Sequence, residues 1–262
     1  MGRRTLALAI LGVGVTACSS SDDSTDSATT PDPTTGPTAT TPPETTTAET
    51  GTGADDAVPE APTAPSLDWA QVAVGNVSAY VLVRGNEAAI VDTGNPGSED
   101  EIGAALQTLG AHYGDVNHVV LTHHHPDHIG SLAGVLAEAP TATAYAGQAD
   151  IENIISPNPL QAVGDGDDIF GLLVIETPGH TPGSISVLDS GIGLLIAGDA
   201  LNTNDGGTEV LGPNASFTAD MTTAIDSVAK LGTRRFETVA VGHGNPVEGG
   251  AADLVAQLAT QL

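Results

Sequence analysis

The sequence predicts an α/β (α+β) fold over residues 66–262, in which two mixed β-sheets pack face to face and helices cover their outer sides. The order of the apolar segments carries this prediction, because strand patterns come first in a cluster and then alternate with helix patterns in each half. The 197 residues of this segment are the usual size of one domain. Hydrophobic residues make up 40% of the chain but aromatic residues only 3%, so the core is expected to be aliphatic.

Short apolar runs bounded by turn residues predict the strands. Gly75-Asn76 and Gly85-Asn86 separate the first three runs, and the second pair fits a two-residue hairpin turn. The run 116–122 is interpreted as a buried strand. The expected strands are residues 71–74, 77–84, 87–92, 116–122, 142–145, 169–176, 184–188, 193–196 and 238–241.

Capping and breaking residues define the helices. Ser98, with Glu101 three residues later, fits a capping box, and Gly110 stops that helix. The second helix follows a histidine-rich segment and ends before Pro140. The expected helices are residues 98–109, 129–138, 148–155, 218–231 and 251–262.

The N-terminal segment resembles a secretory signal followed by a lipid attachment site. Arg3 and Arg4 precede a 13-residue apolar stretch that ends at Ala17, which fits a signal-peptide core and is too short to span a membrane. Cys18, the only cysteine of the chain, follows in a Val-Thr-Ala-Cys context that resembles a bacterial lipobox. We expect residues 1–17 to be removed and Cys18 to be lipidated; the alternative is an ordinary signal peptide with an incidental cysteine.

Residues 18–65 are expected to form a disordered linker behind the lipidated cysteine. Apart from Val58, residues 19–65 are all Thr, Ser, Pro, Asp, Glu, Ala or Gly, which offer too little apolar area to offset the entropy of ordering. The linker is interpreted as a tether through a cell-wall layer or as a featureless spacer. The domain at residues 66–262 is therefore expected to be secreted and lipid-anchored to the outer face of the cell membrane.

The net charge excludes several classes of partner. The chain has 33 acidic and six basic residues, a formal charge of −27, which argues against nucleic acid because phosphate binding needs clustered Lys and Arg. The same shortage argues against a polybasic membrane-binding patch, which leaves the lipid as the expected contact with the membrane. A single cysteine excludes an intramolecular disulfide and a cysteine-rich metal site. A small-molecule substrate is the expected partner.

The histidine-rich segment after the strand 116–122 predicts a metal site. Alternate residues of an extended segment face the same way, so His123 and His125 project together toward one ion. Asp127 and His128 follow at the turn into the next helix, where they can reach a second ion. Neutral imidazole and carboxylate are the ligands of zinc in hydrolytic sites, and burying four such groups without a metal would be costly. The alternative is a solvated histidine-rich loop.

Three more ligand-type residues stand alone at the ends of predicted strands. His180 lies in a Thr-Pro-Gly-His-Thr-Pro-Gly-Ser loop, whose prolines stiffen the backbone and whose glycines allow close approach. Asp199 and His243 each follow an apolar strand and a glycine. Loops at strand ends are where such folds place their functional residues.

Together these motifs resemble those of the metallo-β-lactamase-fold hydrolases, and of their glyoxalase II and lactonase-like branch in particular. They occur in the family's order and cover nearly all of residues 66–262. The matched motifs are Val91-Asp92-Thr93-Gly94, the His-x-His-x-Asp-His run at 123–128, the loop 177–184, Gly198-Asp199 and Gly242-His243-Gly244. The resemblance implies a four-layer αββα sandwich with two divalent ions at one edge of the sheets, most readily Zn²⁺, with Fe or Mn as alternatives.

The resemblance also implies a role for each matched residue. The ligands of the first ion would be His123, His125 and His180, and those of the second Asp127, His128 and His243. Asp199 would bridge the two ions, Asp92 would support the ligands from behind, and Asp127 would also act as the catalytic proton shuttle. His112, His118 and His124 match no ligand position.

Such a dinuclear site implies a hydrolase that attacks the carbonyl carbon of an ester, lactone, thioester or β-lactam with a metal-bound hydroxide. The bridging Asp199 disfavours a true β-lactamase, and we expect the 19 residues after His243 to be too few for the helical domain that glyoxalase II enzymes use to hold glutathione. Two alternatives remain. One is a mononuclear iron enzyme that resembles the persulfide dioxygenases, with His123, His180 and Asp199 as ligands. The other is a non-catalytic metal-binding envelope protein.

Overall fold

The computed structural model describes residues 66–262. The expected signal peptide, the expected lipidation site Cys18 and the linker 18–65 lie outside the described residues. Within the described part of the chain, no helix is both long enough and apolar enough to cross a membrane.

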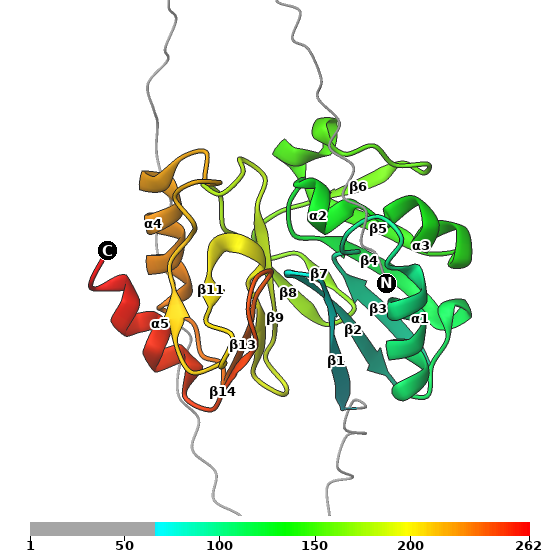
Figure 1. The fold of residues 1–262 in the computed structure, drawn as a ribbon, viewed down its shortest axis with the longest axis horizontal. Coiled ribbons are helices and arrows are strands. Elements are labelled where there is room, and N and C mark those ends of the chain that lie inside the picture. Colours follow the sequence, from blue (N-terminus) through cyan, green and yellow to red (C-terminus); the bar gives the residue numbers. More distant parts are fainter. Residues whose placement is uncertain (1–65) are drawn as a thin grey trace, which may run out of the picture. The chain divides into compact units, whose positions relative to one another are not determined.

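Two six-stranded sheets form the centre of the fold (Figure 1). The first has the order β1-β2-β3-β4-β5-β6, antiparallel over its first three strands and parallel from β3 to β6. Its strands are β1 (Leu67–Val74), β2 (Val77–Arg84), β3 (Glu87–Val91), β4 (Val116–Leu121), β5 (Thr143–Gly147) and β6 (Leu160–Val163).

The second sheet has the order β14-β13-β10-β9-β8-β7 and is antiparallel except for the β10–β13 pair. Its strands are β7 (Asp168–Ile169), β8 (Leu172–Glu176), β9 (Ile185–Asp189), β10 (Leu194–Ile196), β13 (Thr238–Ala240) and β14 (Val247–Glu248). A separate two-stranded ribbon pairs β11 (Asn202–Thr203) with β12 (Val210–Leu211).

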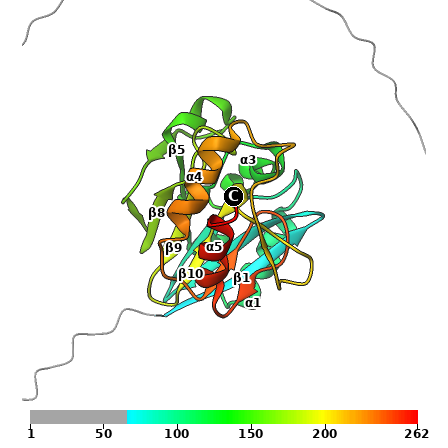
Figure 2. The same cartoon turned by 90° about the vertical axis from the view of Figure 1, so that its left-hand side faces the viewer.

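Helices cover the outer face of each sheet. The first sheet is covered by α1 (Glu99–Thr108) and α3 (Leu132–Glu138), and the second by α4 (Met221–Leu231) and α5 (Ala251–Ala259). The last two lie in front of their sheet in Figure 2. The shorter segments are α2 (Pro126–Ile129), η1 (Tyr113–Asp115), η2 (Gln148–Asn153) and η3 (Gly198–Ala200).

Alternating side chains of the strands fill three aliphatic layers. In β2, Val81 packs toward α1 and α3, whereas Tyr80 and Leu82 pack between the sheets. In β10, Leu195 packs toward α4 and α5, whereas Leu194 faces the other sheet. This period of two is what a strand covered on both faces requires. The predicted αββα sandwich and its aliphatic core are confirmed.

Three expected elements are wrong in form. Of residues 148–155, expected as a helix, Gln148–Asn153 form the 3₁₀ segment η2. Residues 169–176, expected as one strand, form a hairpin of β7 and β8, because Phe170 and Gly171 adopt left-handed φ angles of 61° and 79° that reverse the chain. The helix expected over 129–138 is likewise divided into α2 and α3.

Four strands were not predicted. β11, β12 and β14 have two residues each and β6 has four, so none carries enough alternation of apolar and polar residues to be recognised in the sequence. β6 and β14 form at the edges of the two sheets, where the neighbouring strand offers unpaired backbone groups, and β11 and β12 pair with each other.

Hydrogen bonds between the two sheets fix the edge at which the candidate site lies. The buried hydroxyl of Tyr80 donates to the carbonyl of Val241 at 2.8 Å and accepts from its N–H at 3.1 Å. The N–H of Ser78 donates to the carbonyl of Gly242 at 2.9 Å. Because these bonds join the start of β2 to the loop after β13, they hold Asn76 and His243 in a fixed relation.

Candidate metal centre

Seven ligand-type side chains meet at the loops that follow β4, β8, β10 and β13. They form three overlapping groups, and within each group the ligand atoms lie within 4.8 Å of one another. The groups are His123, His125 and His180; His123, His128 and Asp199; and Asp127, His128 and His243. All seven residues named from the sequence as metal ligands are therefore brought together.

Asp199 lies in the middle of these groups. Its Oδ2 is 3.3 Å from Nε2 of His180 and 3.3 Å from Nε2 of His243, and its Oδ1 is 3.4 Å from Nε2 of His128. Gly198, which precedes it, has a φ of 54°, and a Cβ there would lie 2.7 Å from the hydroxyl oxygen of Thr122. Because Gly198 has no side chain, η3 can approach the end of β4 closely. The carboxylate of Asp199 thereby reaches both His180 and His243.

Three of these imidazoles have a hydrogen-bonding neighbour at Nδ1. Nδ1 of His123 is 3.1 Å from the hydroxyl of Thr122, and Nδ1 of His180 is 3.2 Å from that of Thr218. Nδ1 of His243 donates to the carbonyl of Asn76 at 2.6 Å. These three rings therefore turn their Nε2 toward the centre, which is the arrangement that fixes a metal-binding histidine in one tautomer. His125 instead has its Nδ1 2.9 Å from Nε2 of His180.

Asp92 holds the ring of His128 in the same way, through its Nδ1. Its Oδ2 is 2.9 Å from Nδ1 of His128 and accepts the hydroxyl of Thr122 at 2.7 Å, while its Oδ1 accepts the N–H of Thr122 at 2.7 Å. Asp92 is only 2% exposed and has a φ of 58°, a conformation that a residue other than glycine adopts at a cost. The surrounding hydrogen bonds hold this strained residue in place behind the ligands.

Burial and neighbouring charges shift the pKa values of the histidines in opposite directions. Burial lowers the pKa of His123 and His125, and it lowers the pKa of His180 to about 4. The hydrogen bond to Asp199 raises the pKa of His243 to about 9. Burial opposes a charge on His128, but the adjacent carboxylates outweigh it and raise its pKa.

Unpaired buried atoms show that the centre fits a cation. Nε2 of His123, Nε2 of His128 and Oδ1 of Asp199 are buried and make no hydrogen bond within residues 66–262, although the last two lie 3.4 Å apart. An unpaired buried polar group costs about 1–3 kcal/mol, so three of them around one point are well accounted for by bound divalent ions. A donor set of imidazoles and carboxylates without thiolates suits Zn²⁺ and is also compatible with Fe or Mn.

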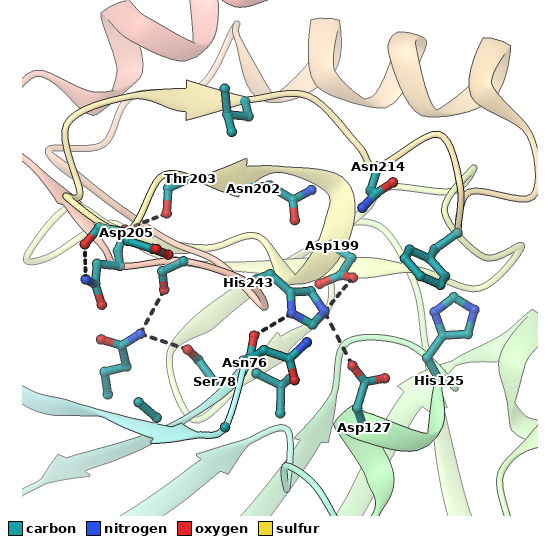
Figure 3. A pocket seen from close by; sticks show the side chains of 18 of the residues that line it. Asn76, Ser78, His125, Asp127, Asp199, Asn202, Thr203, Asp205, Asn214 and His243 are labelled. Atoms are coloured by element: carbon teal, nitrogen blue, oxygen red, sulfur yellow. Dashed lines mark hydrogen bonds and ion pairs between the residues drawn. The ribbon is translucent and has the colours of Figure 1, made fainter.

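A cavity of about 800 Å³ opens onto this centre. Figure 3 shows His125, Asp127, Asp199 and His243 converging at one part of its wall, with His243 linked to Asp199, Asp127 and Asn76. Asp127 is one-third exposed, and its Oδ2 lies 3.4 Å from Nε2 of His243. It therefore faces both the centre and the space that a substrate would enter.

The rest of the cavity wall is neutral or acidic. Its polar lining consists mainly of the side-chain amides of Gln71, Asn76, Asn202, Asn214 and Asn245, together with the carboxylate of Asp205. Leu211 and the largely exposed Phe217 provide apolar surface. None of the four basic side chains of residues 66–262 lines this cavity.

The remaining three histidines lie outside the ligand groups found in the described part of the chain. His112 is exposed and pairs with Asp115, and His118 packs against Tyr145. His124 instead lies against a buried carboxylate, Asp150, that the sequence did not single out. No short motif marks Asp150, because its partners are 26 and 31 or more residues away in the chain.

The fold and the motif order define a family. Residues 72–243 match the metallo-beta-lactamase superfamily, and the chain belongs to it.

Similar proteins cover most of the described domain. The chain is 34% identical over 197 residues to the uncharacterized protein YobT of Bacillus subtilis, covering 64% of this chain and 83% of that protein. It is 33% identical over 129 residues to a hydroxyacylglutathione hydrolase of Aeromonas hydrophila, covering 47% of this chain and 45% of that enzyme. The crystal structure of a metallo-beta-lactamase family protein from Thermus thermophilus, TTHA1429, superposes with a TM-score of 0.59 at 22% identity, covering 74% of this chain and 78% of that one.

Proposed function

We propose that this protein is a dinuclear metal-dependent hydrolase of the glyoxalase II and lactonase-like branch, acting on the carbonyl carbon of an ester, lactone, thioester or β-lactam. The position of Asp199 carries the proposal. Its Oδ2 lies 3.3 Å from Nε2 of His180, which belongs to the group with His123, and 3.3 Å from Nε2 of His243, which belongs to the group with Asp127. A single carboxylate can therefore contact an ion in each of these two groups. The family membership of the chain and its hydrolase relatives support a hydrolytic activity.

Different residues are assigned different roles in such a reaction. The first ion is assigned to His123, His125 and His180, and the second to Asp127, His128 and His243, with Asp199 shared. Bound divalent ions of this kind supply Lewis-acid activation of water and of a carbonyl oxygen. The chain itself fixes the imidazole tautomers through its Nδ1 contacts, and it presents the partly exposed Asp127 to the reacting groups.

Asp127 is assigned the proton transfer. Its carboxylate borders the cavity, so it can accept a proton from the attacking water and return it to the leaving group. Asp92 is assigned a supporting role, because it contacts His128 and Thr122 and does not line the cavity.

The cavity favours neutral or cationic substrates over polyanions. Nine of the 33 acidic residues precede residue 66, so residues 66–262 carry 24 acidic and four basic side chains, a formal charge of −20. Two of the basic residues are already paired, Arg84 with Asp189 and Lys230 with Asp165. A neutral ester or lactone would meet amides and apolar surface in this cavity, whereas a glutathione thioester would meet no lysine or arginine side chain among the described lining residues.

Metal analysis of the purified domain, combined with a panel of an ester, a lactone, a thioester and a β-lactam, tests this proposal. Two divalent ions per chain and metal-dependent turnover of one of these carbonyl compounds are the expected result. One redox-active iron per chain with persulfide oxidation would replace the proposal with the dioxygenase alternative. Metal binding without turnover of any carbonyl substrate would indicate a binding protein.

The cell-surface location is proposed together with the activity. The lipobox at Cys18 and the polar linker that follows it support a lipid-anchored enzyme at the outer face of the cell membrane, because two or more acyl chains give a stable hold.

A further inference from the structure

Asp150 is a completely buried carboxylate that belongs to none of the ligand groups. It lies in η2, directly after β5. Its Oδ2 accepts the backbone N–H of His124 at 3.0 Å and the hydroxyl of Thr181 at 2.6 Å, and its Oδ1 accepts the backbone N–H of Gly183 at 2.8 Å. Nδ1 of His124 also lies 3.0 Å from Oδ2.

These donors belong to the two loops that carry the first ligand group. His124 stands between the two histidines of the loop after β4, His123 and His125, and Thr181 directly follows His180 in the loop after β8. A single side chain therefore holds both loops by their backbones, immediately beside the three imidazoles.

Close packing around Asp150 holds the loop after β8 against it. A Cβ at Gly147 would collide with the carbonyl oxygen of Gly183, and a Cβ at Gly183 would collide with the backbone nitrogen of Asp150. The two glycines thus let the loop after β8 lie directly on the start of η2. The carboxylate is enclosed at this contact, away from solvent.

We propose that Asp150 is a positioning residue that sets the spacing of the two loops and thereby the affinity of the ion held by His123, His125 and His180. The inference rests on the proposed function in so far as it requires a bound ion. Asp92 has the corresponding relation to His128 in the second group. Asp92 also reaches His123 through the hydroxyl of Thr122, so it supports ligands of both ions, whereas the contacts of Asp150 lie in the loops of the first group.

An amide cannot replace this carboxylate. Asp150 accepts three hydrogen bonds and uses both oxygens, whereas an asparagine has one acceptor oxygen and an NH₂ group that donates. In either orientation, Asp150→Asn would turn an NH₂ toward at least one backbone N–H of a ligand loop. The volume of the side chain is nearly unchanged, so the loops are loosened without a cavity being created.

The test compares three buried carboxylates by Zn²⁺ titration of the metal-free domain. The variants are Asp150→Asn, Asp92→Asn and, as a matched control, Asp189→Asn. Asp189 is also buried and also accepts two backbone N–H groups, from Gly191 and Ile192, which lie in neither ligand loop. Calorimetry gives the two affinities, and ¹⁵N NMR of the imidazoles identifies which histidines each ion contacts.

Asp150→Asn should weaken the ion at His125 and His180 by at least about tenfold, the usual lower bound for losing a group that orients metal ligands. The ion at His243 should change by much less. Asp92→Asn should weaken the ion at His243 as well, because Asp92 contacts His128 directly and His123 through Thr122. Asp189→Asn should lower thermal stability without a preference for either ion. An equal loss at both ions in Asp150→Asn, or wild-type affinities in Asp150→Asn, would overturn the inference.

Two further measurements keep the test decisive. Amide hydrogen exchange of His124 and Gly183 in the metal-free domain should accelerate in Asp150→Asn. This measurement needs no bound metal, so it tests the role of Asp150 even if the wild-type protein binds none. If Asp150→Asn does not fold, Thr181→Val removes one of the three donors and keeps the carboxylate. It should weaken the same ion, and an equal loss at both ions would contradict the assignment.

Discussion

Nε2 of His243 lies 3.3 Å from Oδ2 of Asp199, and this contact raises the pKa of the imidazole to about 9 in the metal-free protein. His180 contacts the same oxygen at the same distance, yet burial lowers its pKa to about 4. At neutral pH, His243 therefore carries a proton and His180 does not. The two ligand groups should respond differently to pH.

Metal affinity at the group of Asp127, His128 and His243 should rise as the pH is raised from about 6 to about 9. An ion must displace the proton of His243 and, where His128 is charged, that of His128 too. The affinity should therefore change by about tenfold per pH unit for each proton displaced and level off above the pKa of about 9. The group with His180 should be nearly insensitive over the same range, because its imidazoles are already neutral. Zn²⁺ titrations at several pH values measure both responses. Asp199→Asn is the matched variant, in which the pKa of His243 should fall and the steep dependence should flatten.

Replacement of Asp127 should impair both turnover and the second ion. Asp127→Asn is expected to lower kcat by at least about two orders of magnitude, the usual scale for losing positioned proton transfer. The second ion should also bind more weakly, because an amide is a poorer ligand than a carboxylate. Steady-state kinetics and metal analysis measure the two effects, with Asp226→Asn on the exposed face of α4 as the control. A variant that keeps both ions and wild-type turnover would show that Asp127 is neither ligand nor shuttle.

Substrate preference should depend on ionic strength. The formal charge of −20 on residues 66–262 should repel polyanions most strongly at low salt, since the Debye length reaches about 30 Å at about 0.01 M. The kcat/KM of a polyanionic thioester should rise with added salt, whereas that of a neutral lactone should stay constant. Asp205→Asn removes one negative charge from the cavity wall and should make the kcat/KM of the polyanionic thioester less dependent on salt. A polyanion that is the better substrate at low salt and weakens with added salt would contradict the proposed substrate class.

The attachment of the protein to membranes should depend on Cys18. Cys18→Ala is expected to release the protein from the membrane fraction or to block its maturation, while residues 66–262 stay folded. Fractionation and mass spectrometry of the N-terminus measure this. An unmodified Cys18 in the mature wild-type protein would remove the basis of the lipid-anchor proposal.

The parts that were predicted from the sequence are those with local patterns. The His-x-His-x-Asp-His run combines a strand end with a helix start, so its spacing alone indicates which side chains project together. The αββα sandwich followed from the order of apolar segments and from the family motifs. The convergence of His180, Asp199 and His243 on this run came from the resemblance, because spacing along the chain says nothing about distances between loops.

The parts that were missed depend on contacts between distant segments. The sequence predicts a helix around Asp150. The role of Asp150 depends on its contacts with the loops that carry His124 and Thr181, which no local pattern indicates. The reversal at Phe170 and Gly171 has no turn motif strong enough to interrupt an apolar run. The short strands β6 and β14 owe their form to the sheet edges beside them.

The number and position of the ions test the central claim most directly. Anomalous diffraction from crystals of the metal-loaded domain should give two peaks, one among His123, His125 and His180 and one among Asp127, His128 and His243, with Asp199 between them. A single peak held by His123, His180 and Asp199, in fully loaded protein, would contradict the dinuclear hydrolase.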